Sequence, residues 1–368
     1  MIKIAIFISD VGYGHMVRQR SIIRELEKHF KDPKILIINH SNIEIIEQTF
    51  KERYEYLKWF NNIKLFKTKL GYFDLKKTNN FFDKWHHNKK KIFYLSKIIK
   101  DYDVIISDFV PEAFELAKLN NIKSYGVCHY TWSWFFKNSE YKNKKNLKNL
   151  EKIEMMANKI FVPPFAPKNM FKYNSGKIKN VNFIIEKKRN LTKNKNKKPI
   201  ILVMDNGTKT LSKKISISLK FMNQNPKFKF YVGSASLKKS DLDFVLKSKN
   251  IIPINGLTSI YKEINNVDFV IARGGFNTIS ECLIYKKPAL YAEEKNNPEI
   301  KENLKKIKKD AIGAFIRNND WGKNFNRRVN YFLKYEQKKI KSNLKRYNFL
   351  YNGARQIVKT IKKEVIND

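Results

Sequence analysis

The chain has 368 residues, which is enough for two domains of ordinary size. Hydrophobic residues make up 42% of the sequence, so the chain can bury a substantial core, and this excludes global disorder. The formal net charge of +41 is typical of nucleic-acid-binding proteins, but lysine is spread over the whole chain rather than gathered in one stripe. We therefore expect no nucleic-acid partner, although such a charge attracts nucleotide-sugar diphosphates and acidic membrane surfaces.

The two cysteines, Cys128 and Cys282, lie among apolar neighbours without the spacing of metal ligands. We predict two buried thiols, which fits a reducing compartment. Residues 1–8 enter a strand directly and lack the apolar region and cleavage site of a signal peptide. No apolar run reaches the length of a membrane span. We expect a cytoplasmic location, with the inner face of the membrane as the alternative.

The N-terminal 30 residues predict a strand, a glycine-rich turn and a helix. Residues 3–9 are apolar, and apolar residues recur at helical spacing over 15–30. Gly12, Gly14 and His15 therefore lie in the first turn of a Rossmann-like domain. His15 is the best catalytic candidate, as a general base or as a group that stabilises phosphate charge. The alternative is a histidine that caps the helix.

Residues 54–99, after a second predicted strand at 34–39, are both aromatic and basic. Such a segment suits an interfacial patch for a lipid-linked acceptor with peripheral membrane contact, or a mobile lid. The alternative is a buried helix with a solvated lysine face. His86 and His87 give only a weak metal signal, because no carboxylate or cysteine has matching spacing.

Two further strands, predicted at 103–107 and 123–128, are followed by polar or aromatic residues. Parallel α/β sheets bind ligands at the carboxyl ends of their strands. Asp108 is predicted to be a base or an acceptor-hydroxyl partner, or otherwise the N-cap of a helix at 113–120. The indoles that follow the second strand suit sugar stacking or core packing. The predicted acceptor-binding residues are Gly12, Gly14, Arg18, Glu112, His129, Trp132 and Trp134.

A second Rossmann-like pattern begins after a stretch rich in lysine and asparagine. It contains a strand at 200–204, a turn with Gly207 and Thr208, a helix at 211–222 and a strand at 229–232. We predict an N-terminal acceptor domain at 1–185, a linker at 186–198, a C-terminal donor domain at 199–335 and a helical tail at 336–368.

The most informative stretch forms one βαβ unit within the second domain. A strand at 268–272 and a second at 289–292 flank a glycine turn and a helix, which Asn277 or Thr278 is predicted to cap. Gly274 and Gly275 let the backbone approach a ligand, and the helix N-terminus favours a phosphate. The alternative is that the glycines only close a turn and that Glu281 is a solvated helix residue.

Residues 273–281 read Arg-Gly-Gly-x-Asn-Thr-x-x-Glu, followed by Lys-Pro-Ala-Leu and Glu299-x-x-x-Asn303. This pattern resembles the donor-binding half of family 28 GT-B glycosyltransferases. The resemblance implies that the two glycines hold a diphosphate and that Glu281 holds the ribose of a UDP-sugar. The family commonly has glutamine where this chain has Ile300, so the identity of the donor sugar is open.

Two N-terminal motifs carry further resemblances. Gly-x-Gly-His-x-x-Arg at 12–18 is similar to a glycine-rich loop of family 28 and to the water-activating loop of a nucleotide-sugar hydrolase of the pseudaminic acid pathway. Ser-Asp-x-x-Pro at 107–111 and Tyr-Thr-Trp-x-Trp at 130–134 resemble the glycosyltransferase-like domain fused to some sugar kinases. Together these resemblances imply an α/β, GT-B architecture, in which two Rossmann-like domains face each other across a cleft.

The implied function is transfer of a sugar from a nucleotide-diphosphate donor, UDP-linked, to an unknown glycan or lipid-linked acceptor, with inversion. We expect no metal and no cofactor other than this co-substrate, since backbone amides and helix dipoles would stabilise the leaving diphosphate. The alternatives are a nucleotide-sugar hydrolase in which His15 activates water, and a non-catalytic nucleotide-sugar-binding protein. The predicted donor-binding residues are Gly207, Thr208, Arg273, Gly274, Gly275, Asn277, Thr278, Glu281 and Glu299.

Overall fold

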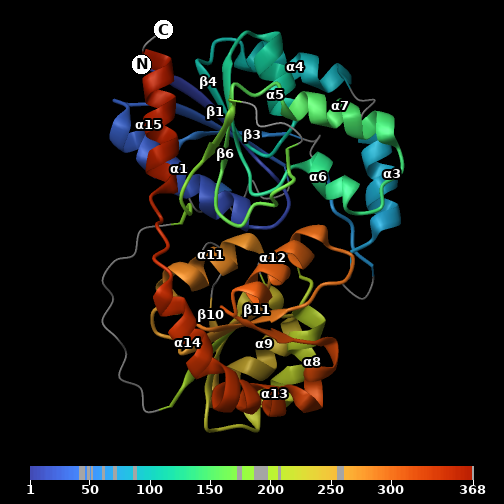
Figure 1. Cartoon of the computed structure of the whole chain (residues 1–368), viewed down its shortest axis with the longest axis vertical. Helices are drawn as coiled ribbons and strands as arrows, with labels where there is room; N and C mark the ends of the chain where they lie inside the picture. Colours follow the sequence, from blue (N-terminus) through green and yellow to red (C-terminus); the bar gives the residue numbers. More distant parts are fainter. Residues whose placement is uncertain are drawn as a thin grey trace. The chain divides into compact units, whose positions relative to one another are not determined.

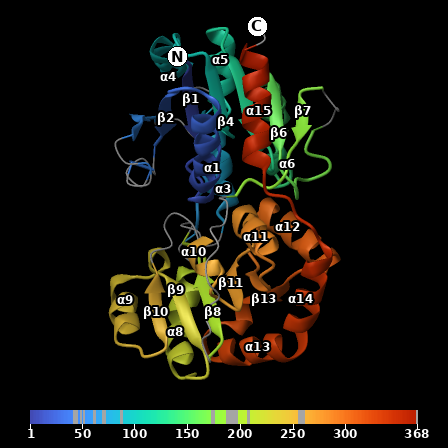
Figure 2. The same cartoon turned by 90° about the vertical axis from the view of Figure 1, so that its left-hand side faces the viewer.

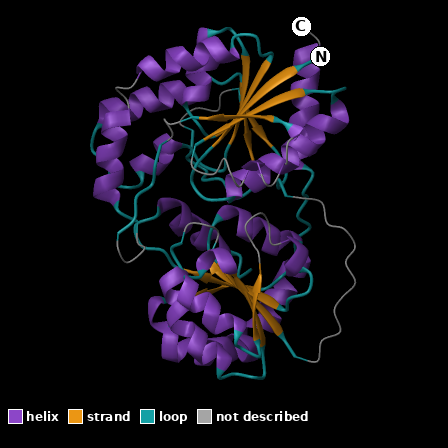
Figure 3. Cartoon of the chain, turned by 180° about the vertical axis from the view of Figure 1, so that it is seen from behind, coloured by secondary structure: helices purple, strands orange, loops and turns teal. Residues whose placement is uncertain are grey.

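The structure is a computed structural model that describes residues 1–40, 46–47, 50, 53–59, 63–68, 73–85, 89–171, 176–185, 198–205, 209–254 and 261–366. The chain divides into two compact units. Unit 1 consists of Met1–Phe66, Asp74–Ile185 and Tyr351–Asp368, and unit 2 consists of Lys67–Phe73 and Glu186–Leu350. In each unit helices cover a parallel sheet (Figures 1 and 3), so the predicted α/β fold with two Rossmann-like halves is confirmed.

The sheet of unit 1 has the strand order β3-β2-β1-β4-β5-β6-β7, and all of its described pairings are parallel. Its strands are β1 (Lys3–Ile8), β2 (Lys34–Asn39), β3 (Glu55–Lys58), β4 (Val104–Asp108), β5 (Lys123–Val127), β6 (Lys159–Val162) and β7 (Ile178–Asn180). Its helices are α1 (Gly14–His29), α3 (Leu75–Trp85), α4 (Lys89–Ile99), α5 (Glu112–Leu119), α6 (Trp132–Lys137), α7 (Lys144–Glu154) and α15 (Gly353–Ile366). The chain runs outward from β1 through β2 and returns to β4 on the other side of β1. This topological switch point is where open α/β sheets bind ligands.

The sheet of unit 2 repeats this topology in the order β10-β9-β8-β11-β12-β13, with its switch point between β8 and β11. Its strands are β8 (Ile200–Met204), β9 (Lys229–Gly233), β10 (Ile251–Ile254), β11 (Phe269–Arg273), β12 (Ala289–Ala292) and β13 (Ala314–Ile316). Its helices are α8 (Ser212–Asn223), α9 (Lys239–Leu246), α10 (Tyr261–Ile264), α11 (Phe276–Ile284), α12 (Pro298–Lys309), α13 (Phe325–Tyr331) and α14 (Gln337–Arg346).

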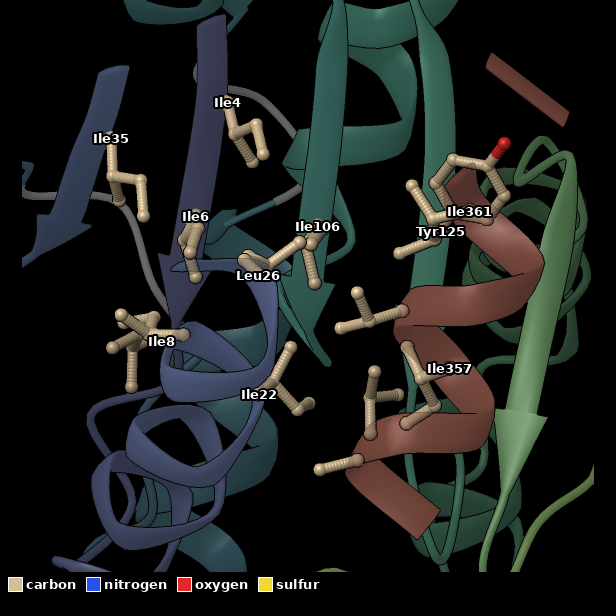
Figure 4. Packing of buried hydrophobic residues seen from close by; sticks show 14 of the residues in the cluster. Ile4, Ile6, Ile8, Ile22, Leu26, Ile35, Ile106, Tyr125, Ile357 and Ile361 are labelled. Atoms are coloured by element: carbon tan, nitrogen blue, oxygen red, sulfur yellow. The ribbon is translucent and has the colours of Figure 1, made fainter. Parts of the chain in front are cut away.

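The predicted tail divides between the two units. Helix α14 lies in unit 2, whereas α15 packs beside α1 in unit 1 (Figures 1 and 2). Ile357 and Ile361 of α15 are fully buried in the cluster that also holds Ile106 and Tyr125 from the sheet (Figure 4). The last helix of the sequence therefore completes the core of the first domain.

Gly353 is required where α15 begins. Its amide donates to the carbonyl of Phe183 at 3.1 Å, and a Cβ atom at this position would lie 2.0 Å from the carbonyl oxygen of Asn182. Because real Cβ atoms do not approach backbone oxygens so closely, only glycine lets the chain pass at this point.

Two sequence predictions outside the site can be compared with the structure, and a third falls outside the described residues. Cys128 and Cys282 are free, buried thiols, as predicted. Among the described helices, none combines the length and apolarity needed to cross a bilayer. Residues 186–197 of the predicted linker lie outside the described part of the chain.

Candidate active site

His15 and Asp108 meet at the switch point of unit 1. Asp108 is the last residue of β4 and lies beside Ile8, the last residue of β1. Gly12, with a positive φ of 76°, turns the chain after β1 so that α1 starts at Gly14. The Nδ1 atom of His15 lies 2.7 Å from Oδ1 of Asp108. Strand order and the glycine turn therefore bring together two residues that are distant in sequence.

Asp108 is fully buried, and three side chains from α1 hold its carboxylate. The Nε atom of Arg18 and the Nε2 atom of Gln19 donate to Oδ2 at 2.9 and 3.0 Å, and Nη2 of Arg18 donates to Oδ1. Burial alone would raise the pKa of Asp108, but the charges and hydrogen bonds of Arg18 and His15 hold this pKa well below its ordinary value. Asp108 is therefore ionised at neutral pH.

The ionised carboxylate determines the tautomer of His15. A carboxylate oxygen only accepts hydrogen bonds, so the Nδ1 atom at 2.7 Å must carry the proton. Arg18 Nη2, 3.0 Å from the same nitrogen, then gives its own hydrogen bond to Asp108. The Nε2 atom of His15 has no hydrogen-bond partner among the residues that the structure describes, and 12% of the side chain is exposed. This nitrogen is available to accept a proton from a ligand.

The structure also settles the capping alternatives for these two residues. The N-cap of α1 is Tyr13, and the N-cap of α5 is Pro111, and neither cap position forms a side-chain cap hydrogen bond. Helix capping by His15 or Asp108 is therefore wrong.

Glu112 and His129, two predicted acceptor-binding residues, are buried. The Nε1 atom of Trp85 donates to Oε1 of Glu112 at 2.5 Å. Burial raises the pKa of Glu112 to about 8 despite this bond. The ring of His129 packs edge-on against Tyr130 at 4.7 Å between centroids. The structure therefore shows both residues inside unit 1 rather than at an open surface.

Trp132 and Trp134 are buried in an aromatic cluster with Tyr130, Phe135 and Phe136. The Nε1 atom of Trp132 donates to the carbonyl oxygen of Phe109 at 2.9 Å. Core packing, one of the two predicted alternatives, accounts for both indoles.

The aromatic, basic segment forms β3, α3 and α4, and much of it also belongs to the core. Trp59, Phe82 and Trp85 are buried, whereas Phe93 and Tyr94 on α4 are exposed. The buried-helix interpretation therefore fits α3, and His86 and His87 lie outside the described residues.

In unit 2 the predicted βαβ stretch forms β11, α11 and β12. Helix α11 begins at Phe276 with Gly275 as its N-cap and no side-chain cap, so the predicted capping by Asn277 or Thr278 is wrong. A Cβ atom on Gly274 would lie 2.7 Å from Cδ2 of Leu304, and Nδ2 of Asn303 donates to the carbonyl oxygen of Gly274 at 3.1 Å. This glycine thus lets α12 approach the turn closely.

Two carboxylates lie beside the guanidinium group of Arg273. Its Nε atom donates to Oε2 of Glu294 at 2.6 Å, and its Nη2 atom lies 3.9 Å from Oε2 of Glu299. Glu299 also accepts from the amide of Phe276 at 3.4 Å. Burial would lower the pKa of Arg273, but these carboxylates raise it above its ordinary value. The positive charge of Arg273 is therefore balanced by carboxylates of unit 2. Glu299 also contacts the N-terminus of α11.

The remaining donor-binding candidates are partly described. Thr278 and Glu281 are buried on α11, with 2% and 8% of each residue exposed, and Asn277 is half-buried. Gly207 and Thr208 lie outside the described residues. Among the described residues, no group of three or more His, Cys, Asp or Glu side chains is placed to hold a metal ion.

Comparisons with known proteins agree with this geometry. Residues 200–361 match the glycosyltransferase family 28 C-terminal domain. MurG of Acinetobacter baumannii has a similar structure, with a TM-score of 0.59 and 10% identity over 99% of this chain and 100% of MurG. The chain is a GT-B glycosyltransferase that resembles family 28.

Two other solved structures share the fold of this glycosyltransferase. A UDP-glucosyltransferase from Polygonum tinctorium has a TM-score of 0.67 and 11% identity over 100% of this chain and 99% of its own. A UDP-N-acetylglucosamine 2-epimerase has a TM-score of 0.61 and 11% identity over 100% and 97% of the two chains. None of the curated protein sequences matches the chain.

Sequence reasoning missed three polar residues of the glycosyltransferase that the structure places beside the candidates. Gln19 follows Arg18 on α1 and binds Asp108, Asp205 follows β8 and its charge acts on Arg273, and Glu294 follows β12 and binds Arg273. For Asp205 and Glu294 a signal was available, because polar residues one or two positions after a buried parallel strand lie at the ligand-binding edge of the sheet.

Proposed function

We propose that this glycosyltransferase uses a UDP-sugar donor, works without a metal, and inverts the anomeric centre, with His15 as its general base. The observation that carries the proposal is the hydrogen bond between His15 Nδ1 and the ionised Asp108. Such a pair leaves Nε2 of a histidine basic and fixes its tautomer.

In this mechanism His15 Nε2 accepts the proton of an acceptor hydroxyl. The hydroxyl oxygen forms a bond to the anomeric carbon of the donor, while the bond from that carbon to the diphosphate oxygen breaks. The diphosphate leaves with the electron pair, and Asp108 stabilises the positive charge on the imidazolium ring without taking its proton. One displacement of this kind inverts the configuration of the anomeric carbon.

The donor would bind at the carboxyl edge of the sheet in unit 2. The amides at the N-terminus of α11, apart from that of Phe276, which donates to Glu299, favour a diphosphate, and Glu281 supplies a carboxylate for ribose hydroxyls. In place of a metal, these amides and nearby cations would stabilise the leaving group.

A nucleotide-sugar hydrolase is the second candidate, because the same His15–Asp108 pair can activate water instead of an acceptor hydroxyl. The deciding experiment incubates the protein with a panel of UDP-sugars, with and without a panel of glycan and lipid-linked acceptors, and analyses the products. A new glycosidic bond with inverted configuration supports the transferase. Free sugar formed equally with and without acceptors supports the hydrolase, and binding without turnover supports a non-catalytic protein.

A further inference from the structure

Unit 2 contains a short segment from the N-terminal half of the chain. Lys67–Phe73 belongs to unit 2, although the residues on both sides of it belong to unit 1. Lys67 pairs with the buried Phe73 in an isolated antiparallel bridge, so the two ends of this segment lie side by side. Lys67, from the first half of the sequence, is therefore part of unit 2.

The side chain of Lys67 is half-buried, and the charges that act on it belong to residues at the carboxyl edge of this sheet. The charges that act on it are those of Arg273 at the end of β11, Asp205 after β8, Glu294 after β12, and Lys209 before α8. Burial, followed by the positive charge of Arg273, lowers the pKa of Lys67 to about 8. These are the strand ends at which the donor is proposed to bind.

The ammonium group of Lys67 has no hydrogen bond or ion pair with any residue that the structure describes. Arg273 differs, because Glu294 and Glu299 already neutralise its guanidinium. The carboxylates of Asp205 and Glu294 favour the charged form of Lys67, but they do not offset its burial and the charge of Arg273, because the pKa of Lys67 is still lowered. An anion that binds beside the ammonium group would therefore stabilise it. Unsatisfied and perturbed groups of this kind concentrate at functional sites.

We infer that Lys67 is a donor-binding residue whose ammonium group donates hydrogen bonds to the diphosphate of the nucleotide-sugar. The inference rests on the proposed function. It assigns the positively charged contact with the diphosphate to Lys67 rather than to Arg273, whose charge is already paired with carboxylates. An ammonium ion suits this task because it presents three donors on a flexible stem. The ligand class is a nucleoside diphosphate with or without its sugar.

The test is calorimetric binding of UDP and of uridine to the full-length protein and three variants. Lys67→Ala is expected to weaken UDP binding roughly 10- to 100-fold, the usual loss for a charge-assisted hydrogen bond, and to leave uridine binding unchanged. Lys67→Arg keeps the charge and should retain most of the affinity. Lys76→Ala, an exposed lysine on α3, removes the same charge and should change nothing.

A pH series adds a readout that a purely structural lysine would not affect. Lys67 loses its proton as the pH rises through about 8, so UDP affinity of the unmodified protein should fall between pH 7 and 9. This fall should be absent in Lys67→Ala and in Lys67→Arg.

Unchanged UDP affinity in Lys67→Ala overturns the inference, as does an equal loss of affinity for UDP and uridine. If the unmodified protein binds neither UDP nor another nucleoside diphosphate, the proposed function fails together with the inference. Binding of UDP by the unmodified protein therefore separates the two claims.

Discussion

The Nδ1 atom of His15 lies 2.7 Å from Oδ1 of Asp108, although 93 positions separate the two residues in the sequence. The pairing arises because β1 and β4 are neighbours in the sheet and both end at the same edge. Arg18 and Gln19 fix the carboxylate from the same helix that carries His15. The fold therefore keeps the proton of His15 on Nδ1, because it holds the Asp108 carboxylate beside that nitrogen.

Asp108→Asn should lower turnover by roughly 10²- to 10⁴-fold, because the asparagine amide can donate to Nδ1 and favour the wrong histidine tautomer. Steady-state kinetics measure this loss. Thermal unfolding should be followed in parallel, since the variant leaves the buried Arg18 without its counter-charge. Asp103→Asn, before the amino end of β4, is the matched control and should keep normal turnover. Normal turnover in a folded Asp108→Asn variant would contradict the role of the pair.

Glu281→Ala should weaken UDP binding by about 1–3 kcal/mol, the usual cost of losing hydrogen bonds to a charged group. Calorimetry with UDP and with its 2′,3′-dideoxy analogue measures the effect. The unmodified protein should bind the analogue less tightly than UDP, whereas Glu281→Ala should bind both ligands equally. A variant that still prefers UDP would remove Glu281 from the ribose site.

Glu154 should make the stability of unit 1 depend on pH. It is buried against Ser133, whose amide donates to Oε1 at 3.1 Å, and burial raises the pKa of Glu154 to about 8. In the unfolded chain this pKa is near 4.5, so stability falls as pH rises from about 4.5 to about 8. The slope is at most about 1.4 kcal/mol per pH unit for this group.

Glu154→Gln keeps the shape of the side chain and removes the ionisation. The variant should lose this part of the pH dependence and should be more stable than the unmodified protein at pH 8. Denaturant unfolding at pH 5, 6.5 and 8 measures the difference. An equal slope in both proteins would show that Glu154 is ionised in the folded state.

The tail helix gives a stability prediction with an internal control. Ile357→Ala removes a fully buried side chain from the core of unit 1 and should cost about 2–5 kcal/mol of unfolding free energy. Ile366→Ala, on the same helix with 62% of the residue exposed, should cost less than about 0.5 kcal/mol. Similar losses for the two variants in denaturant unfolding would contradict the docking of α15.

The strands at both switch points were predictable because buried parallel strands appear in the sequence as apolar runs. The predictions for β2, β8 and β12 agree with the structure at both ends. Strand β7 has only three residues, none of them buried, and so leaves no apolar pattern to read. The existence of two Rossmann-like halves followed from local sequence, whereas the weakest edge strands did not.

The candidate residues were predictable one by one, but their partners were not. Pairing of His15 with Asp108 depends on strand order, which single-sequence periodicity does not reveal. The start of α11 was misplaced because the amide of Phe276 meets Glu299, 23 residues later, rather than a local cap. Similarly, no local signal places Lys67 in unit 2, because its neighbours in sequence belong to unit 1.

The central claim is that His15 acts in the chemical step. His15→Ala, measured by single-turnover kinetics beside equilibrium binding of the UDP-sugar, tests it most directly. We predict a roughly 10²- to 10⁴-fold loss of turnover with nearly unchanged donor affinity, because a general base acts mainly in the transition state. His15→Asn should recover part of the loss only if the histidine contacts phosphate instead. Near-normal turnover in His15→Ala would contradict the claim.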